Sequence, residues 1–405
     1  MKTRVAMIFG GKTVEHEVSV ISGIQACMAM DTDKYEVIPV YMTKDNEMYL
    51  GSGTGDIKSY RDIPALIRNS QRVIMVNDNG RVMLVPYPAK RWGGAKPVEI
   101  DIAFPVVHGT NVEDGALQGF LKTVGVPFVG PDVTASAVSM DKYVTKAILK
   151  EAGIPVLDAR IYTLADYAEM ESMLDDVEEH IGYPVIIKPV NLGSSVGISI
   201  AKNRGELVNS MDDAFRYATR VMAEHAISKL REINCAVLGN ENEAIASECE
   251  EPLHTDEILS YEDKYVNNAG GKGGKTGGSK SGGSKGAGMA SVARKIPAEL
   301  SPEEREEVRD LAVKSFKALG CCGVSRIDFM IDEDNGELYF NEINPIPGSL
   351  AFYLWEPVGV PYTELLDRMI QLAFRRQREE EAITFTFDTN ILANANLGGS
   401  KGSKR

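Results

Sequence analysis

The sequence has few cysteines, no excess of positive charge and no long apolar run. Its five cysteines are odd in number, and no two of them have a C-x-x-C spacing. This pattern argues against a zinc site or a disulfide framework and favours a reducing compartment. Near the N-terminus the apolar run covers only residues 5–9, which is shorter than a signal peptide requires, and no segment approaches the length of a membrane span. We therefore expect a soluble cytoplasmic protein without a membrane partner.

Negative charge predominates in the composition. The 405 residues include 44 Lys and Arg against 58 Asp and Glu, which gives a formal net charge of −14. Such a balance favours solubility and argues against a general partnership with nucleic acids. The hydrophobic fraction of 43% is that of an ordinary globular protein, and the length predicts two or three domains.

Strand-like and helix-like segments alternate from the start of the chain. An apolar strand at 5–9, a Gly-Gly turn and a segment with helical spacing predict the opening of an α/β domain. Further strands are expected at 35–41, 102–107, 185–188, 198–201 and 235–238, and helices at 113–123 and 142–152. The positions of glycine and proline residues suggest domains at 1–130, 131–223 and 224–385. A tail follows at 386–405, and we expect its end to be disordered.

One helix is clearly delimited by its end signals. Ser301 is a suitable N-cap, Pro302 occupies the first helical position, and Glu304 completes a capping box. Gly320 then ends the helix. By contrast, residues 267–288 contain ten glycines and four lysines and cannot pack a core by themselves.

Two alternating segments, 324–331 and 337–344, flank a turn signal at 334–336 and predict a β-hairpin. A three-residue loop would pair Glu333 with Glu337. The same register places Asp328 opposite Glu342 and Arg326 opposite Asn344. A two-residue turn would give a different pairing.

This register would place two carboxylates in direct opposition, with Cβ atoms roughly 4.5–5.5 Å apart. Like charges at that distance are destabilising unless a cation lies between them. Mg²⁺ would satisfy Asp328 and Glu342 through oxygen ligands, and Asn344 extends the same face. The alternative is an acidic hairpin that binds no ligand.

Candidate phosphate and substrate groups lie where strands end. Lys188 ends a strand and precedes the small-residue loop 193–197, which would let backbone N–H groups approach phosphate oxygens. Two Walker-like strings fail because alanine occupies the required first glycine, at Ala6 and Ala269. His108 and the segment 15–17 also follow predicted strands, where ligands of α/β folds gather.

Taken in order, several motifs cover nearly the whole chain. They are the segments 9–19, 108–119, 140–142, 188–197, 261–265, 326–328 and 341–348. In this order they resemble the D-alanine–D-alanine ligases of the ATP-grasp superfamily. The resemblance implies an α/β fold, with α+β character in the ATP-clasping part, and a three-domain ATP-grasp architecture that begins with an open α/β sheet. It also implies a homodimer, ATP as co-substrate, and a lid at about 261–290.

The resemblance implies a role for each candidate site residue. The metal ligands of two Mg²⁺ or Mn²⁺ ions would be Asp328, Glu342 and Asn344. The nucleotide would be bound by Lys142, Lys188, Ser195, Glu224 and Glu232. The catalytic groups would be Glu15, Ser194, Lys264, Tyr265 and Arg326, of which Glu15 would orient the ammonium group of the first D-alanine. The substrate pockets would be lined by Val18, His108, Gly348, Ser349 and Tyr353.

The family chemistry activates one carboxylate as an acyl phosphate, which the amine of a second D-alanine then attacks. A lid would exclude water from that intermediate. Three departures concern the substrates and nucleotide: Val112 replaces a glycine, the nucleotide segment at 226–232 lacks its usual glycine turn, and the run 349–354 is altered. Tyr353 stands where the family has a serine that grips the second carboxylate.

Other functions are therefore open. D-alanyl-D-serine ligation is the nearest alternative, because the altered run borders the second pocket. D-alanyl-D-lactate ligation is disfavoured by Tyr265. A catalytically inactive nucleotide-binding relative and a polyanion-binding module built on residues 272–285 are further alternatives, although the four lysines of that segment lack interleaved aromatic residues.

Overall fold

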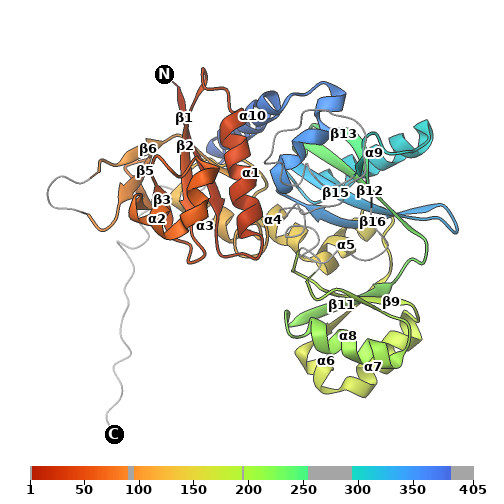
Figure 1. Cartoon of the computed structure of the whole chain (residues 1–405). Coiled ribbons are helices and arrows are strands. Elements are labelled where there is room, and N and C mark those ends of the chain that lie inside the picture. Colours follow the sequence, from red (N-terminus) through yellow and green to blue (C-terminus); the bar gives the residue numbers. More distant parts are fainter. Residues whose placement is uncertain (1, 90–94, 194–195, 254–293, 385–405) are drawn as a thin grey trace, which may run out of the picture.

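The computed structural model of the chain describes residues 2–89, 95–193, 196–253 and 294–384. Within these residues three β-sheets follow one another along the chain, and each is covered by helices (Figure 1). None of the helices in the described residues combines the length and apolarity needed to cross a bilayer.

The first sheet has the strand order β6-β5-β4-β3-β2-β1-β7. Its strands are β1 (Thr3–Gly10), β2 (Tyr35–Met42), β3 (Met48–Leu50), β4 (Gln71–Asp78), β5 (Arg81–Pro86), β6 (Val98–Ile100) and β7 (Ile102–Pro105). The associated helices are α1 (His16–Ala29), the 3-10 helix η1 (Ile57–Asp62), α2 (Ile63–Arg68) and α3 (Ala116–Val124). β1 pairs in parallel with β2 and β7, whereas the other neighbours pair antiparallel.

The parallel centre of this sheet is fully buried. All five residues of the apolar run at 5–9 have no exposed surface, as expected of a parallel strand covered on both faces. Because β1 and β7 run in the same direction, the loops that follow them lie at the same edge of the sheet. Glu15 and His108 belong to those two loops, so the fold brings them to one place.

The second sheet is antiparallel, with the order β10-β9-β11-β8. Its strands are β8 (Ala159–Thr163), β9 (Val185–Pro189), β10 (Ser199–Ala201) and β11 (Arg220–His225). The helices α6 (Leu164–Ala168), α7 (Met170–His180) and α8 (Arg204–Ala214) lie on one side of it (Figure 1). Side chains from these helices and strands form a separate apolar core.

The third sheet has the order β14-β13-β12-β15-β16 and is antiparallel throughout. Its strands are β12 (Leu230–Gly239), β13 (Ala244–Pro252), β14 (Arg294–Lys295), β15 (Gly323–Asp332) and β16 (Glu337–Asn344). Helix α9 (Pro302–Ala318) covers one face, and α4 (Val133–Met140) and α5 (Lys142–Glu151) add Ala135 and Leu149 to the same core.

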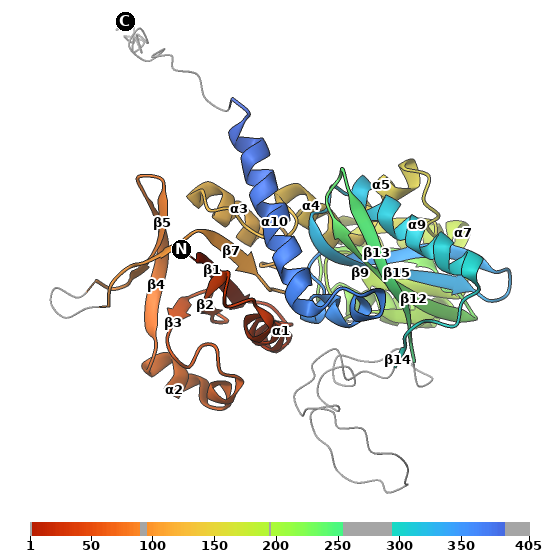
Figure 2. The ribbon, with the colours of Figure 1, turned by 90° about the horizontal axis from the view of Figure 1, so that it is seen from above.

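The C-terminal segments connect the third sheet to the first. They are η4 (Gly348–Leu354), η5 (Glu356–Val358) and α10 (Tyr362–Glu381). Figure 2 shows α10 running between the first sheet and the third. Leu350, Trp355 and Leu365 are completely buried in the same core as β1, so the first and third sheets are joined by a continuous apolar interface.

Most predicted elements are confirmed within one to three residues at each end, and the cap signals are confirmed in detail. The Ser301 hydroxyl accepts a hydrogen bond from the Glu304 N–H at 3.2 Å, and the Glu304 carboxylate accepts one from the Ser301 N–H at 2.7 Å. Gly320 follows the end of α9 with a φ of 65°. The antiparallel strands β3 to β6 were not predicted.

Candidate active site

The β15–β16 hairpin confirms the predicted pairing of Asp328 with Glu342, but by a different route. Asp332 pairs with Glu337, so the loop has four residues and the predicted pairing of Glu333 with Glu337 is wrong. A bulge then shifts the register between Phe329–Phe340 and Asp328–Glu342, leaving one additional residue, Asn341, on β16. The longer loop and the bulge offset each other, which restores the expected pair.

Each of the two opposed carboxylates has a cationic partner. Arg326 donates to both oxygens of Asp328, from Nε and Nη2 at 2.7 Å each, and Asn344 Nδ2 lies 3.1 Å from Asp328 Oδ2. Lys142 Nζ lies 3.3 Å from Glu342 Oε2. Burial raises the pKa of Asp328 to about 6, with Glu342 and Glu250 adding to the rise while Arg326 opposes it. A divalent cation at this face would replace part of the pairing that Arg326 and Lys142 make with the two carboxylates.

This set of donors fits a hard divalent cation. Two carboxylates and an amide on one sheet face present oxygen ligands of the kind that Mg²⁺ and Mn²⁺ prefer. Within the described residues no group of three or more His, Cys, Asp or Glu side chains is arranged to hold a metal. An ion here would therefore depend on the pair Asp328 and Glu342, on the Asn344 oxygen, and on ligands from a bound phosphate.

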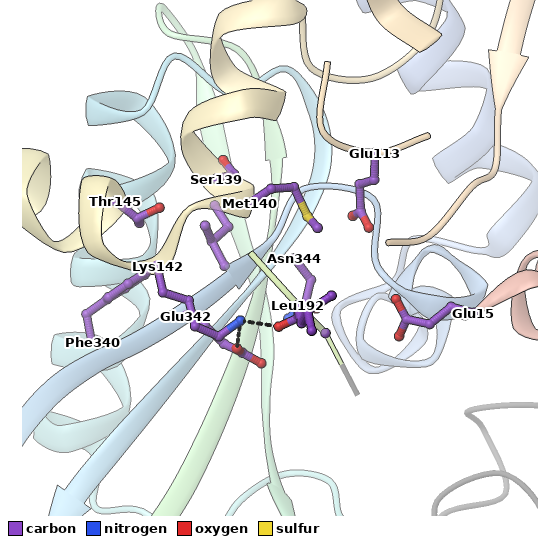
Figure 3. Close-up of a pocket in the computed structure, with 12 residues that line it drawn as sticks. Glu15, Glu113, Ser139, Met140, Lys142, Thr145, Leu192, Phe340, Glu342 and Asn344 are labelled. Atoms are coloured by element: carbon purple, nitrogen blue, oxygen red, sulfur yellow. Dashed lines mark hydrogen bonds and ion pairs between the residues drawn. The ribbon is translucent and has the colours of Figure 1, made fainter. Parts of the chain in front are cut away.

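A pocket joins the hairpin to the loops of the first sheet (Figure 3). Its polar lining comes from Glu15 beside α1, Glu113 after β7, Lys142 at the start of α5, and Glu342 and Asn344 on β16. In Figure 3 the Lys142 side chain reaches toward both Glu342 and Leu192, whose carbonyl oxygen accepts a hydrogen bond from Lys142 Nζ at 2.8 Å. The pocket thus lies between groups from widely separated parts of the chain.

Two glycines bring the backbone close to the Glu15 carboxylate. A Cβ atom added at Gly109 would lie 2.9 Å from Glu15 Oε2 and 2.4 Å from Thr13 Oγ1, and one added at Gly193 would lie 3.1 Å from Glu15 Oε2. Gly109 also has a φ of 85°, which residues other than glycine rarely adopt. The carboxylate is therefore held between the loops after β7 and β9.

A buried ion cluster lies on the second sheet and α5. Glu224 on β11 is completely buried and forms ion pairs with both Lys188 on β9 and Lys146 on α5. Burial would raise the pKa of Glu224, but the two lysines outweigh it and hold that pKa at about 2. Lys188 Nζ also lies 3.3 Å from Asn341 Oδ1 in the bulge of β16, so this cluster contacts the hairpin directly.

His108 connects the first sheet to the loop after β16. Its Nδ1 lies 2.8 Å from the Ile346 carbonyl oxygen, so Nδ1 carries the proton, and Nε2 accepts from the Ser22 hydroxyl at 3.0 Å. The same hydroxyl accepts from the Ser349 N–H at 2.9 Å. Burial lowers the pKa of His108 to about 4, which keeps the ring neutral at neutral pH.

Glu113 makes a parallel connection. Its two carboxyl oxygens accept hydrogen bonds from the Gly109 N–H at 2.7 Å and the Ile346 N–H at 2.8 Å. Complete burial raises its pKa to about 8, and nearby Glu15 adds to the rise. His108 and Glu113 together fix the position of Ile346, two residues beyond Asn344.

The altered run after Gly348 occupies η4. Ser349, Leu350 and Ala351 have positive φ values of 52°, 54° and 49°, which are unusual for residues other than glycine. The Ser349 hydroxyl donates to Gln25 Oε1 at 2.7 Å on α1, so this side chain points toward the first sheet. Tyr353, at the other end of η4, contacts the third sheet instead: its hydroxyl donates to Glu250 Oε1 on β13 at 3.3 Å.

The remaining predicted residues lie elsewhere or outside the described residues. Val18 is buried on α1, and Glu232 lies on β12 opposite Met330. The predicted residues that fall outside the described part are Ser194, Ser195, Lys264 and Tyr265, together with the lid at 261–290.

Several groups that the fold brings to the site were not predicted from the sequence. Lys146 follows Lys142 by four residues on one helix, so the i,i+4 spacing was an available signal. Glu250 and Arg294 gave no such signal, because their proximity depends on the pairing of β13 with β12 and β14. Glu113 was seen as part of a motif, but its role in holding Ile346 was not predicted.

Three sheets in succession, with the acidic hairpin and Lys142 at one pocket, are the architecture of an ATP-grasp protein. A family model described as "D-ala D-ala ligase N-terminus" matches residues 4–131, and one described as "D-ala D-ala ligase C-terminus" matches residues 148–273 and 285–371. The chain therefore belongs to the D-alanine–D-alanine ligase family.

Individual relatives agree with this assignment over almost their whole length. The D-alanine–D-alanine ligase of Caldicellulosiruptor bescii is 37% identical over 397 residues, which are 95% of this chain and 99% of the relative. Among solved structures, the D-alanine-D-alanine ligase from Coxiella burnetii has a TM-score of 0.73 at 28% identity, covering 94% of this chain and 96% of that one. The VanG D-Ala:D-Ser ligase from Enterococcus faecalis has the same TM-score and identity, covering 92% of this chain and 100% of that one.

Proposed function

We propose that this protein joins two D-alanines to D-alanyl-D-alanine at the expense of ATP, as a step in making peptidoglycan precursors. Family membership over nearly the full chain supports the reaction. The observation that carries the proposal is the pocket in which Glu15, Lys142, Glu342 and Asn344 meet, because it joins a group suited to an ammonium to groups suited to phosphate.

In the first step, a carboxylate oxygen of the first D-alanine attacks the γ-phosphorus of ATP. The bond from that phosphorus to the bridging oxygen breaks, and its electron pair leaves with ADP. Glu15 pairs with the substrate ammonium, which orients the attacking carboxylate. His108 holds the backbone after β16 in place through its hydrogen bond with Ile346, and Val18 is buried on α1.

Charge on the transferring phosphoryl group is neutralised by lysines. Lys142 and Lys188 lie next to the hairpin, where Glu342 and Asn341 contact their ammonium groups. We assign both lysines to the nucleotide phosphates. The segment from Glu224 to Glu232 binds the adenine and ribose in this proposal.

Asp328, Glu342 and Asn344 are the residues that would hold Mg²⁺ or Mn²⁺, as a pair of ions. A bound ion supplies positive charge to the phosphate oxygens in this chemistry. Arg326, which pairs with Asp328 on the same strand, would face the carbonyl oxygen of the acyl phosphate.

In the second step, the amine of the second D-alanine attacks the acyl carbon. The carbonyl oxygen gains negative charge, which Arg326 stabilises, and the bond to phosphate breaks as the peptide bond forms. We propose that Gly348, Ser349 and Tyr353 bind the second substrate. Ser194, Ser195, Lys264 and Tyr265 retain the roles that the family resemblance implies, with the lid at 261–290 excluding water from the acyl phosphate.

We extend the proposal to the organisation of the protein. We assign domains to residues 1–130, 131–223 and 224–385, with ATP bound between the second and third, and the succession of three sheets along the chain supports a division into three. The working form is a homodimer in the cytoplasm, where ATP is supplied. Light scattering of the purified protein should give twice the chain mass of 44.2 kDa, and cell fractionation should recover it with cytoplasmic enzymes. Monomer mass, or recovery outside the cytoplasm, would contradict these two assignments.

The experiment that tests the reaction supplies ATP and Mg²⁺ with D-alanine, D-serine and D-lactate together, and separates the products by mass. We expect phosphate release matched by D-alanyl-D-alanine as the main product. Phosphate release without a coupled product would refute ligase activity.

D-alanyl-D-serine ligation is the second candidate. It is favoured by the altered run at 349–354 and by the likeness to the VanG D-Ala:D-Ser ligase. In the same experiment D-alanyl-D-serine would then exceed D-alanyl-D-alanine at equal concentrations of the two second substrates.

A further inference from the structure

One loop of the first sheet has hydrogen bonds to segments that belong to all three sheets. This bridging loop, residues 108–113, lies between β7 and α3. Its backbone is held by bonds of its own: the Glu113 N–H donates to the Gly109 carbonyl oxygen at 2.9 Å, and the Asn111 N–H donates to Asp114 Oδ2 at 2.7 Å. The bridging loop therefore has a defined shape from which its side chains can hold neighbouring segments.

Two connections fix the bridging loop to the first and third sheets. The Asn111 side-chain Nδ2 donates to the Lys12 carbonyl oxygen at 2.9 Å, in the loop that follows β1. Glu113 accepts from the Ile346 N–H and His108 donates to the Ile346 carbonyl oxygen, both at 2.8 Å, in the segment that follows β16. The bridging loop is therefore a fixed point between these two sheets.

A third connection reaches the second sheet. The Thr110 hydroxyl donates to the Asn191 carbonyl oxygen at 3.0 Å. Asn191 lies two residues beyond the end of β9, in the segment 190–193. This bond links the loops of the first sheet to a part of the second sheet that lines the pocket, because Leu192 and Gly193 are both lining residues.

The segment 190–193 lies between the two groups that the proposed reaction assigns to different substrates. Lys142, assigned to the nucleotide phosphates, donates to two of its carbonyl oxygens, from the backbone N–H and from Nζ, at 2.8 Å each. Glu15, assigned to the ammonium of the first D-alanine, lies against its other end, since a Cβ added at Gly193 would be 3.1 Å from Glu15 Oε2. A shift of this segment would therefore change the surroundings of both groups.

Thr110 acts on the pocket from outside it. Thr110 and Asn191 are described residues, and neither belongs to the lining of the pocket. Their hydrogen bond is accessible to water, so it has the strength of an ordinary neutral bond. A bond of that strength suffices to bias the position of a short segment without making the segment rigid.

We propose that the Thr110 hydroxyl positions the segment 190–193 before either substrate binds, and so prepares the Lys142 side and the Glu15 side of the pocket together. This inference rests on the proposed ligation and adds a positioning residue to it. Without the hydroxyl, the segment leaves the binding-competent position in part of the molecules. Each substrate alone then binds more weakly, because its binding has to restore that position. Once one substrate has restored it, the other binds as it does to wild type.

The test measures the Kd of a non-hydrolysable ATP analogue with Mg²⁺ by calorimetry, without and with saturating D-alanine, for wild type and Thr110→Val. Valine keeps the branched Cβ of threonine and lacks the hydroxyl. We expect the Kd of the analogue alone to rise about two- to tenfold, the range for one neutral hydrogen bond. With D-alanine saturating, the Kd should return to the wild-type value. D-alanine should therefore strengthen analogue binding more in the variant than in wild type.

Two further variants separate the hydroxyl from the shape of the side chain. Thr110→Ser keeps a hydroxyl and should bind the analogue as wild type does in both measurements. Thr123→Val is the matched control, because it removes an exposed hydroxyl that donates to the Gly119 carbonyl oxygen at 2.8 Å on α3, and it should change neither Kd. Melting temperatures establish that each variant is folded.

The outcomes distinguish the inference from the function on which it rests. Wild type that binds no analogue, or that forms no dipeptide in the competition assay, overturns the ligation itself. Thr110→Val with the wild-type Kd in both measurements overturns the role of Thr110. A Kd raised by the same factor without and with D-alanine would show that the hydroxyl only supports local structure, and a Thr110→Ser variant as weak as Thr110→Val would also contradict the inference.

Discussion

The Lys146–Glu224–Lys188 cluster supports a quantitative prediction about stability. Replacement of Glu224 by glutamine keeps the size of the side chain but leaves two buried ammonium groups without their carboxylate. The fall in the Glu224 pKa from 4.5 to about 2 corresponds to about 3 kcal/mol of stabilisation at neutral pH. Breaking a buried ion pair by removing one partner costs about 3–5 kcal/mol in general, so the two figures agree.

The assay is urea unfolding followed by circular dichroism. At pH 7 the midpoint for Glu224→Gln should fall by up to about 1 M, from about 3 kcal/mol divided by a slope of about 3 kcal/mol/M. Because the pKa of Glu224 is depressed in the folded protein, its stabilisation is complete above pH 4.5 and is lost as the pH falls through about 2. The difference between wild type and variant should therefore narrow below pH 4.5.

The matched control is Glu251→Gln, whose carboxylate pairs with Arg231 at 2.8 Å on a more exposed part of the same protein. This change should cost about 1 kcal/mol or less. A second arm adds Lys146→Met to Glu224→Gln, which removes one unpaired ammonium and should recover part of the lost stability. The reasoning is refuted if Glu224→Gln and Glu251→Gln have equal midpoints at pH 7.

Three further predictions follow from the connections between sheets and from the cap of α9. The His108 ring should titrate near pH 4 in NMR spectra, and the protein should lose stability as the pH falls from 6.5 to 4, because the unfolded state binds the proton first; titration at 6.5 would contradict the burial argument. Burial raises the pKa of Glu113 to about 8, so its contribution to stability is complete below pH 4.5 and declines as the pH rises to 8. Glu113→Gln should therefore weaken the dependence of the melting temperature on pH between 5.5 and 8.5. The same pH dependence in the variant and in wild type would contradict this role of Glu113. Ser301→Ala should cost about 1 kcal/mol in urea unfolding through the loss of the capping bond to Glu304; no measurable loss would show that the cap is dispensable.

The strands and helices with strong periodic or capping signals could be predicted from the sequence. The run at 5–9 and the helix after Ser301 are examples, because local chemistry determines both. The antiparallel strands β3 to β6 could not, since short strands of three to eight residues with mixed exposure carry weak patterns.

The hairpin shows how a correct prediction can rest on an incorrect step. The expected loop of three residues has four, and a bulge at Asn341 restores the pairing of Asp328 with Glu342. Bulges insert a residue without a distinctive sequence signal, so the compensation could be found only in the structure. The bulge also presents Asn341 to Lys188.

The sequence located the region that binds the second substrate, but it did not show which side chain there takes the place of the family's serine. Counting placed Tyr353 at a serine position and left Ser349 as an equal candidate. The structure separates them, because the positive φ values of η4 turn Ser349 toward Gln25 and Tyr353 toward Glu250. Arg294 lies 44 residues after Glu250 in the chain, and no local pattern connects two such distant positions.

The proposed reaction depends most on the hairpin face that carries Asp328 and Glu342. The direct test is the rate of D-alanyl-D-alanine formation by Glu342→Gln beside wild type, with ATP and Mg²⁺ saturating and with matched melting temperatures. We expect a fall of about 100-fold or more, because the variant loses one of the two carboxylates that would hold the divalent cation, and that cation would neutralise charge on the transferring phosphoryl group. Dipeptide formation at the wild-type rate would contradict it.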